Sequence, residues 1–215
     1  MNHKNIFITG GTGYVGKAVI PELLKKGYKF TALVRKGSEQ KIPQGCDVVF
    51  GNALDENTFE DKIDSADTFI QLVGVSHPSP SKAEQFKTVD LASAKASVLA
   101  AKKSGVKHFI YISVAHPAPI MKAYFEARVE AEKFLRENLS IATIIRPWYV
   151  LGQSHRWPYL LLPAYWILKR IPSTKESALR LDLVTLKQMV RTIINAVENP
   201  PSGIRIVEVQ EIKKF

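Results

Sequence analysis

Three glycines near the start of the chain, Gly10, Gly13 and Gly16, have the spacing of a turn that holds a phosphate group. They follow the apolar run 6–9 and lead into a helical pattern that continues through Lys17. Such glycines allow a tight turn, a close backbone approach to a pyrophosphate and close packing of the helix on the sheet. The helix adds unpaired N–H groups and its positive dipole end. The pattern predicts a dinucleotide site, although a turn without a ligand would use the same glycines.

Two cations, Arg35 and Lys36, follow the second predicted strand, 29–34. A dinucleotide fold that prefers NAD has an acidic residue here for the ribose 2′-hydroxyl, whereas an arginine accommodates a 2′-phosphate. Arg35 could also stack on the adenine while it pairs with that phosphate. The sequence therefore predicts NADP(H) in preference to NAD(H), with two solvated loop cations as the alternative.

No metal site is expected, because the five histidines lack the spacings that ligate metals. His77, His116 and His155 fall in predicted loops at the carboxyl ends of strands, where each is expected to be an ordinary loop residue. His116 lies between Ser113 and Tyr124 and could contact a substrate. No GxSxG sequence surrounds Ser113, so a hydrolase triad is not expected.

Strands and helices alternate along the chain with short loops, which predicts an α/β fold with a doubly wound parallel sheet, the Rossmann fold. The predicted strands read as nearly continuous apolar runs, as strands buried on both faces do. They are expected at 5–9, 29–34, 47–50, 68–73, 109–113, 142–146 and 204–209. Helices are expected at 14–26, 56–63, 82–104, 124–138 and 182–197.

Composition limits the partners and the compartment. A chain of 215 residues, 46% of them hydrophobic, can form one domain with a full core. Its net charge of +10 favours anionic partners such as a phosphorylated cofactor, but the cations are dispersed and no nucleic-acid motif accompanies them. We therefore expect a small-molecule substrate and no nucleic acid. The single cysteine, Cys46, and the lack of a signal peptide or membrane span predict a cytoplasmic protein.

The glycine motif at 9–16 resembles the TGxxGxxG motif of the short-chain dehydrogenase/reductase superfamily, in its atypical and extended branch. Residues 51–55 resemble the adenine-contacting GDLxD of that branch, with Asn52 for Asp, and 72–74 match its glycine after the fourth strand. Arg146-Pro147 resembles its RPxxVxG. The branch includes NmrA-like NAD(P)H-binding proteins and epimerase/dehydratase-like enzymes. Together these patterns imply cofactor-binding residues at Gly10, Thr12, Gly13, Tyr14, Val15, Gly16, Arg35, Lys36, Asn52, Ala53, Leu54, Leu72, Val73, Gly74, Ser113, Tyr124, Arg128 and Pro147.

The resemblance also implies catalytic residues. In that family a tyrosine gives a proton to a carbonyl oxygen, a serine orients the carbonyl, and a lysine four residues after the tyrosine holds the ribose. Tyr124 and Ser113 match the first two, and Arg128 stands in the place of the lysine. Positions i and i+4 of a helix share a face, so Tyr124 and Arg128 could act together. Arginine keeps the charge but has another shape and cannot release its proton.

The resemblance therefore implies an NADP(H)-dependent oxidoreductase acting on a small apolar carbonyl or quinone-like substrate. A non-catalytic NADP(H)-binding protein, either a redox sensor or a structural subunit, is the alternative, because Arg128 replaces the lysine. A nucleotide-sugar epimerase or dehydratase agrees less well, because those enzymes carry a larger C-terminal substrate region.

The segment 157–170 is rich in Trp, Tyr and Leu, ends in Lys169 and Arg170, and is too short to span a bilayer. The resemblance implies that it covers an apolar substrate pocket, as a lid. Packing between two copies and peripheral contact with a membrane are alternatives, and a monomer or a homodimer is expected. We expect 151–182 to be a small substrate-side appendage of a single domain, 1–215.

Overall fold

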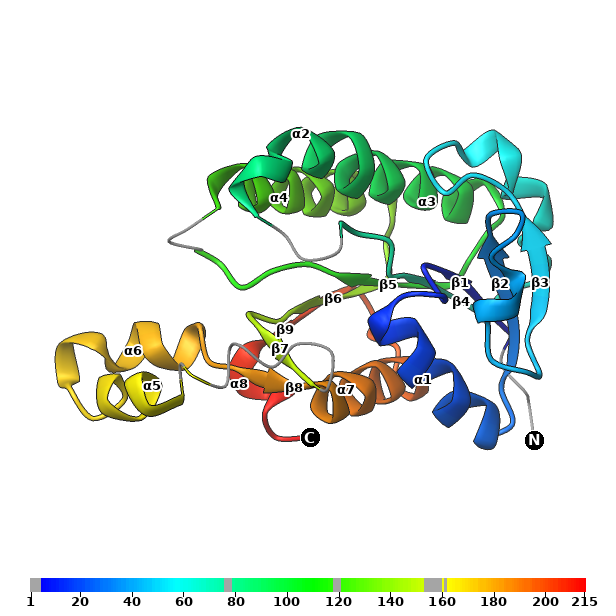
Figure 1. Cartoon of the computed structure of the whole chain (residues 1–215). Coiled ribbons are helices and arrows are strands. Elements are labelled where there is room, and N and C mark those ends of the chain that lie inside the picture. Colours follow the sequence, from blue (N-terminus) through cyan, green and yellow to red (C-terminus); the bar gives the residue numbers. More distant parts are fainter. Residues whose placement is uncertain (1–4, 76–78, 118–120, 153–159, 161) are drawn as a thin grey trace.

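A seven-stranded parallel sheet forms the centre of the computed structural model, which describes residues 5–75, 79–117, 121–152, 160 and 162–215 (Figure 1). The strand order is β3-β2-β1-β4-β5-β6-β9 and every neighbouring pair is parallel. The strands are β1 (Asn5–Thr9), β2 (Lys29–Val34), β3 (Asp47–Phe50), β4 (Thr68–Gln71), β5 (His108–Ile112), β6 (Ala142–Arg146) and β9 (Ile204–Glu208). This order confirms the predicted doubly wound α/β fold. It reverses between β1 and β4, where such sheets bind ligands.

Helices cover both faces of this sheet. One face carries α1 (Tyr14–Lys25), α7 (Leu186–Glu198) and the short α8 (Val209–Ile212), and the opposite face carries α3 (Ala92–Lys103) and α4 (Lys122–Asn138), as Figure 1 shows. A separate apolar core lies on each face. The helices therefore bury both faces of the sheet, including both faces of β1, the strand that leads into the glycine turn.

The residues of β1 show how a continuous apolar run serves both cores. Ile6 and Ile8 belong to the core beneath α1 and α7, whereas Phe7, between them, belongs to the opposite core. There the Phe7 ring lies 5.2 Å from the ring of Phe69 on β4. Side chains alternate between the two faces of a strand, so the successive positions 6, 7 and 8 of β1 must all be apolar when helices cover both sides.

The predicted helix 82–104 is interrupted in the structure. A 3₁₀ turn (Pro80–Lys82) and a short α2 (Ala83–Gln85) lead into a π-helical segment, Phe86–Leu91, before α3 begins. A π-helical turn has one residue more than an α-helical turn and occurs often at functional sites. Here the π-helical segment contains the buried Asp90, whose carboxylate accepts hydrogen bonds from the Val75 N–H and from Arg128. The predicted helix 56–63 is likewise two 3₁₀ turns, Glu56–Thr58 and Glu60–Lys62.

The C-terminal part differs most from the expected elements. Val150–Leu151 (β7) pairs with Val184–Thr185 (β8), so the helix expected from residue 182 starts at Leu186, after a capping box formed by Thr185 and Gln188. Between these strands, α5 (Leu162–Leu168) and α6 (Pro172–Arg180) form a hairpin that stands at one end of the molecule (Figure 1). None of the described helices combines the length and the apolar character needed to cross a membrane.

Candidate functional site

The turn between β1 and α1 is shaped by the space that its glycines leave free. Gly10 has a φ of +75°, and a Cβ there would lie 2.6 Å from the carbonyl carbon of Leu72. A Cβ on Gly16 would lie 2.6 Å from the Cα of Gly11, so α1 can approach the turn only with glycine there. A Cβ on Gly13 would meet the Gly10 carbonyl oxygen at 3.1 Å and nothing else within 4 Å. Gly10 and Gly16 thus serve the fold, and Gly13 keeps the approach to the turn open.

The amino end of α1 supplies donors to this open space. The first N–H groups of an α-helix have no acceptor within the helix. The N-cap residue, Gly13, has no side chain to cap them, and the first turn of α1 holds no acidic residue. The helix dipole adds partial positive charge at the same end. Unpaired donors, positive charge and an open approach are what a pyrophosphate requires, so this turn fits a dinucleotide.

A cavity of about 320 Å³ lies beside the turn, at the carboxyl ends of β2 and β3. Arg35 is the only charged residue among the described residues that line it. Its guanidinium is exposed and forms no ion pair with a described residue, and Ser38 lines the cavity as well. At the carboxyl end of β2, where a dinucleotide fold holds the ribose, the described lining residues thus offer a free cation and no carboxylate. Its other lining residues are Gly10, Thr12, Gly13, Leu33, Val34, Gly51, Asn52, Ala53, Leu54, Leu72, Val73, Gly74 and Val89.

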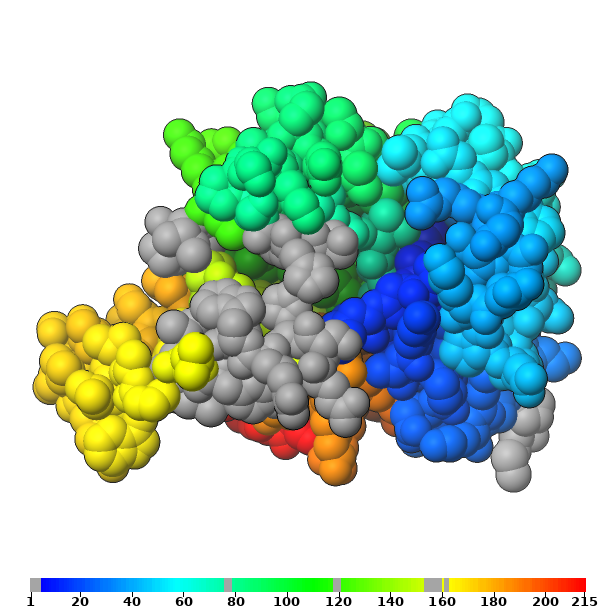
Figure 2. All heavy atoms as spheres, in the orientation of Figure 1, coloured from blue at the N-terminus to red at the C-terminus, as the bar shows by residue number. Residues whose placement is uncertain are grey.

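A second cavity, of about 230 Å³, continues from the first across the turn. The two share Gly10, Gly13 and the segment 72–74, so together they form one groove over the carboxyl ends of β1 and β4. Figure 2 shows this part of the molecule hollowed between the blue segment of the turn and the green segment above it. The second cavity is lined further by Tyr14, Val15, Gly16, Gln71, Val75, Ile112 and Arg128.

Two residues of the second cavity carry buried polar atoms that the described chain leaves unsatisfied. Gln71 Nε2 donates to the Val73 carbonyl oxygen at 3.2 Å and to Ser93 Oγ at 3.1 Å, but no described residue donates to Gln71 Oε1. The Nε of Arg128 likewise has no acceptor among the described residues. Buried polar groups are rarely left unpaired, so an acceptor and a donor at this cavity fit a ligand with both kinds of polar group.

Arg128, on α4, is anchored by three groups from other segments. Its Nη1 donates to the Ile112 carbonyl oxygen at 2.6 Å and to Tyr111 Oη at 3.4 Å. Its Nη2 donates to Asp90 Oδ1. A Cβ on residue 74 would lie 2.7 Å from the same Nη2, which explains the glycine after β4. The guanidinium is therefore held in one orientation beside the second cavity.

The Asp90–Arg128 pair is a buried ion pair, with 0% and 7% of the two side chains exposed. The other oxygen of Asp90 accepts a hydrogen bond of 2.9 Å from the backbone N–H of Val75, just after the glycine. Burial lowers the pKa of Arg128, but Tyr111, Tyr124 and Asp90 together raise the pKa above its ordinary value. Arg128 therefore stays charged and cannot exchange a proton near neutral pH.

Tyr124 lies one helical turn before Arg128. The centre of its ring is 5.2 Å from the guanidinium carbon of Arg128 and 5.0 Å from the ring of Phe86 in the π-helical segment. Tyr124 and Arg128 thus share a face of α4, as their spacing predicts. Tyr124 does not line either cavity, however.

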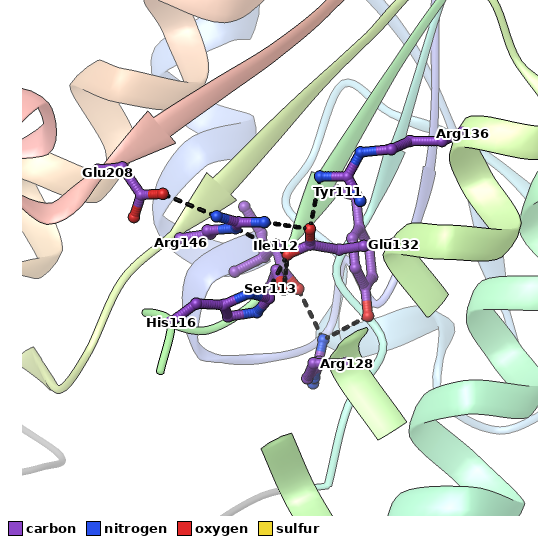
Figure 3. A network of polar contacts seen from close by, with 9 residues as sticks. All are labelled: Tyr111, Ile112, Ser113, His116, Arg128, Glu132, Arg136, Arg146 and Glu208. Atoms are coloured by element: carbon purple, nitrogen blue, oxygen red, sulfur yellow. Dashed lines mark hydrogen bonds and ion pairs between the residues drawn. The ribbon is translucent and has the colours of Figure 1, made fainter. Parts of the chain in front are cut away.

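Ser113, just after β5, contacts the buried Glu132 and not Tyr124 or Arg128. Its hydroxyl donates a hydrogen bond of 2.6 Å to Glu132 Oε1, within a network that Figure 3 shows. Glu132 also accepts hydrogen bonds from Arg146 Nε at 2.9 Å and from Arg136 Nη2 at 2.8 Å. His116 Nε2 lies 3.4 Å from the same carboxylate. Burial raises the pKa of Glu132, but the hydrogen bonds and the cations outweigh it and lower that pKa.

The structure thus gathers most of the predicted cofactor residues in one groove. Four of them, Lys36, Ser113, Tyr124 and Pro147, do not line either cavity, and Ser113 and Pro147 are buried. The predicted loop residues His77 and His155 lie outside the described residues. Among the residues that are described, no three His, Cys, Asp or Glu side chains come together in a way that could hold a metal ion.

Sequence reasoning missed the two carboxylates that organise the site, Asp90 and Glu132. Each had a signal in the sequence, because each lies on the apolar stripe of a predicted helix. Asp90 stands four residues after the buried Phe86, and Glu132 stands three residues before the buried Leu135. An acid on a stripe that must be buried requires a cationic or N–H partner, but the sequence does not say which one.

Comparison with known proteins places the chain in a family. The model of the NAD(P)H-binding family matches residues 10–157. The chain belongs to this family. It is 29% identical over 162 residues to an NmrA-like family domain-containing protein of Dictyostelium discoideum, which covers 68% of the chain and 51% of that protein. It is 26% identical over 161 residues to the chloroplastic divinyl chlorophyllide a 8-vinyl-reductase of Arabidopsis thaliana, covering 66% of the chain and 38% of the reductase.

The chain thus spans at most about half the length of these curated relatives. Among solved structures, the enzyme WbmH of Bordetella bronchiseptica in complex with NAD+ matches 94% of the chain and 75% of the enzyme, with a TM-score of 0.71 and 20% identity. At this identity the likeness shows the fold. The resemblance predicted from the motifs is confirmed at the level of the NAD(P)H-binding family, whose model covers most of the chain.

Proposed function

We propose that this protein is an NADP(H)-dependent oxidoreductase that reduces a small, apolar carbonyl or quinone-like substrate. The observation that carries the proposal is the cavity beside the glycine turn, where Arg35 is an unpaired cation and none of the described lining residues is a carboxylate. An exposed guanidinium can pair with a 2′-phosphate through two hydrogen bonds, whereas a 2′-hydroxyl offers it little. The Val15, Val75 and Ile112 side chains of the second cavity favour an apolar substrate.

In this proposal four groups share the work: the amino end of α1, Arg35 and Arg128 at the groove, and Tyr124, whose ring lies beside the Arg128 guanidinium. The N–H groups at the start of α1 hold the pyrophosphate, and Arg35 holds the 2′-phosphate. When bound, NADPH supplies a hydride to the substrate carbon and is oxidised as the carbonyl is reduced. The Tyr124 phenol gives its proton to the substrate oxygen and takes a proton from water afterwards. Arg128 keeps its proton and stabilises the negative charge that develops on the phenol oxygen.

Cofactor selectivity tests the first part. NADPH should bind more tightly than NADH by the worth of one or two charge-assisted hydrogen bonds, about 1.5–3 kcal/mol each, or at least about 10-fold in Kd. Arg35→Ala should remove most of this difference in calorimetry. The matched control is Lys133→Ala, which deletes an exposed cation on α4 and should leave both affinities unchanged. Equal affinities of the parent protein for NADPH and NADH would refute the preference.

Turnover tests the second part. Tyr124→Phe should reduce kcat for NADPH oxidation by about 10²–10⁴-fold across quinones, aldehydes and ketones, because it removes the proton donor. The Kd of NADPH should stay within about 2-fold, since the phenol acts only as charge develops on the substrate. Full turnover in the Phe variant would show that another group is the acid.

A second candidate, a non-catalytic NADP(H)-binding protein, is favoured by one observation. The Ser113 hydroxyl, which would orient a carbonyl, donates to the buried Glu132 instead. Tight binding of NADPH by the parent protein, without oxidation by any member of the same panel, would support this candidate and overturn the reductase.

A further inference from the structure

The α5–α6 hairpin, residues 162–180, together with Leu160, carries the largest concentration of exposed apolar side chains in the described chain. Five of its nine exposed large hydrophobic residues lie here: Leu160, Trp166, Ile167, Leu168 and Ile171. Leu160 is 82% exposed, Trp166 61% and Ile167 52%, more than any of the four that lie elsewhere. A soluble surface rarely leaves so many large apolar groups together in water, and such a patch marks an interaction site.

The same hairpin carries several cations. The Arg170 guanidinium lies over the Trp166 ring, 3.3 Å from its centre. Arg170 and Lys175 form no ion pair with a described residue, while Lys169 pairs with Asp182 at 2.6 Å. An open hollow of about 450 Å³ is lined by Tyr165, Trp166, Lys169 and Arg170. A lipid headgroup region presents the matching features, which are phosphate oxygens above an apolar layer.

We propose that the α5–α6 hairpin docks on the surface of an anionic lipid bilayer. Trp166 and Ile167 enter the boundary between headgroups and acyl chains, and Arg170 and Lys175 pair with lipid phosphates. Trp is suited to this boundary because its ring is apolar and its N–H is polar, and long cationic side chains reach from an apolar surface to the headgroups. The net charge of +10 attracts the whole molecule to a negative surface.

Two features favour a bilayer over a second copy of the chain. In a two-fold interface both copies bury the same surface, so the unpaired cations of two hairpins would be brought into one interface without added counter-charges. The position of the hairpin also suits a bilayer, because Figures 1 and 2 show it projecting at one end of the molecule. Neither cavity of the cofactor groove has a lining residue from 160–180, so the proposal does not depend on the cofactor.

The test is sedimentation of the full chain with vesicles of phosphatidylcholine, alone or mixed with phosphatidylglycerol. The parent protein should bind the mixed vesicles, and added salt should weaken binding. Arg170→Gln/Lys175→Gln should weaken binding about 30-fold, since each cation near an anionic surface contributes about 5-fold. Lys25→Gln/Lys133→Gln removes the same charge from two exposed sites elsewhere and should change binding much less. Ile167→Glu should abolish binding, whereas Val129→Glu, at an exposed apolar site on α4, should not.

Two further measurements keep the proposal open to refutation. Trp fluorescence should shift to the blue on vesicles, and Trp166→Phe should remove most of that shift. Unchanged thermal unfolding and NADPH affinity will show that each variant folds, because the changed residues are exposed and lie outside the groove. Absence of binding to the mixed vesicles overturns the proposal. Binding that is unchanged in Ile167→Glu also overturns it. A third refuting result is a parent protein that does not bind vesicles but forms a dimer in sedimentation velocity, if Ile167→Glu dissociates that dimer.

Discussion

The buried pair of Asp90 and Arg128 should be among the most sensitive points of this fold. Asp90→Asn keeps an oxygen that can accept from the Val75 N–H, but it leaves the guanidinium buried without its counter-ion. Breaking a buried pair by removing one member costs about 3–5 kcal/mol, because the remaining charge is uncompensated. For a domain of this size each kcal/mol lowers Tm by about 2–4 °C, so a decrease of about 6–20 °C is expected.

A double-mutant cycle measures how much of this cost belongs to the pair. Arg128→Met removes the guanidinium and leaves the carboxylate buried, so it should be costly as well. The double variant should be more stable than the sum of the two single changes predicts, by at least about 1 kcal/mol, since neither charge remains. The exposed pair Lys95–Glu130 serves as control, and its coupling energy should stay below about 1 kcal/mol. The measurement is urea unfolding of all variants at neutral pH.

The conservative variant separates geometry from charge. Arg128→Lys keeps the charge but has a single ammonium, which cannot reach Ile112, Tyr111 and Asp90 together as the guanidinium does. Its stability should fall between those of the parent and Arg128→Met. A coupling energy below about 1 kcal/mol, or a lysine variant as stable as the parent, would refute the argument that this pair positions α4 against β4 and β5.

Three other outcomes are expected. Gly13→Leu should fold normally but lose dinucleotide binding in calorimetry, because its side chain would occupy open space in front of the turn, and intact binding would exclude this site. Gly10→Ala should instead lower Tm, since φ is +75° and a Cβ would lie 2.6 Å from the Leu72 carbonyl carbon; an unchanged Tm would contradict this. Glu132 has a folded pKa below its ordinary 4.5, so it contributes stability above that pH and loses it as the pH falls through the folded value. Urea unfolding from pH 7 to pH 3 should show this loss in the parent and not in Glu132→Gln, which should be less stable at pH 7.

The sequence by itself determines the frame of this protein because its signals are local. The run 6–9 must be a buried strand, since Ile6, Phe7 and Ile8 are apolar in succession and glycines follow Thr9. The glycines at 10, 13 and 16 specify the turn. The strand bounds at 5–9, 29–34, 47–50 and 142–146 agree with those observed. Even the preference proposed for the cofactor rests on local information, because Arg35 follows a strand whose end must face the groove.

Tertiary structure alone decided which polar groups meet. Asp90 and Arg128 are 38 residues apart, and only the packing of the π-helical segment against α4 brings the carboxylate to the guanidinium. The sequence predicted that the Ser113 hydroxyl would contact a substrate, whereas in the structure this hydroxyl donates to Glu132 Oε1 at 2.6 Å. Composition likewise could not show whether Trp166 and Ile167 would be covered or exposed. Local sequence determines backbone conformation and the face that is buried, but the partner of a buried charge depends on the relative placement of distant elements.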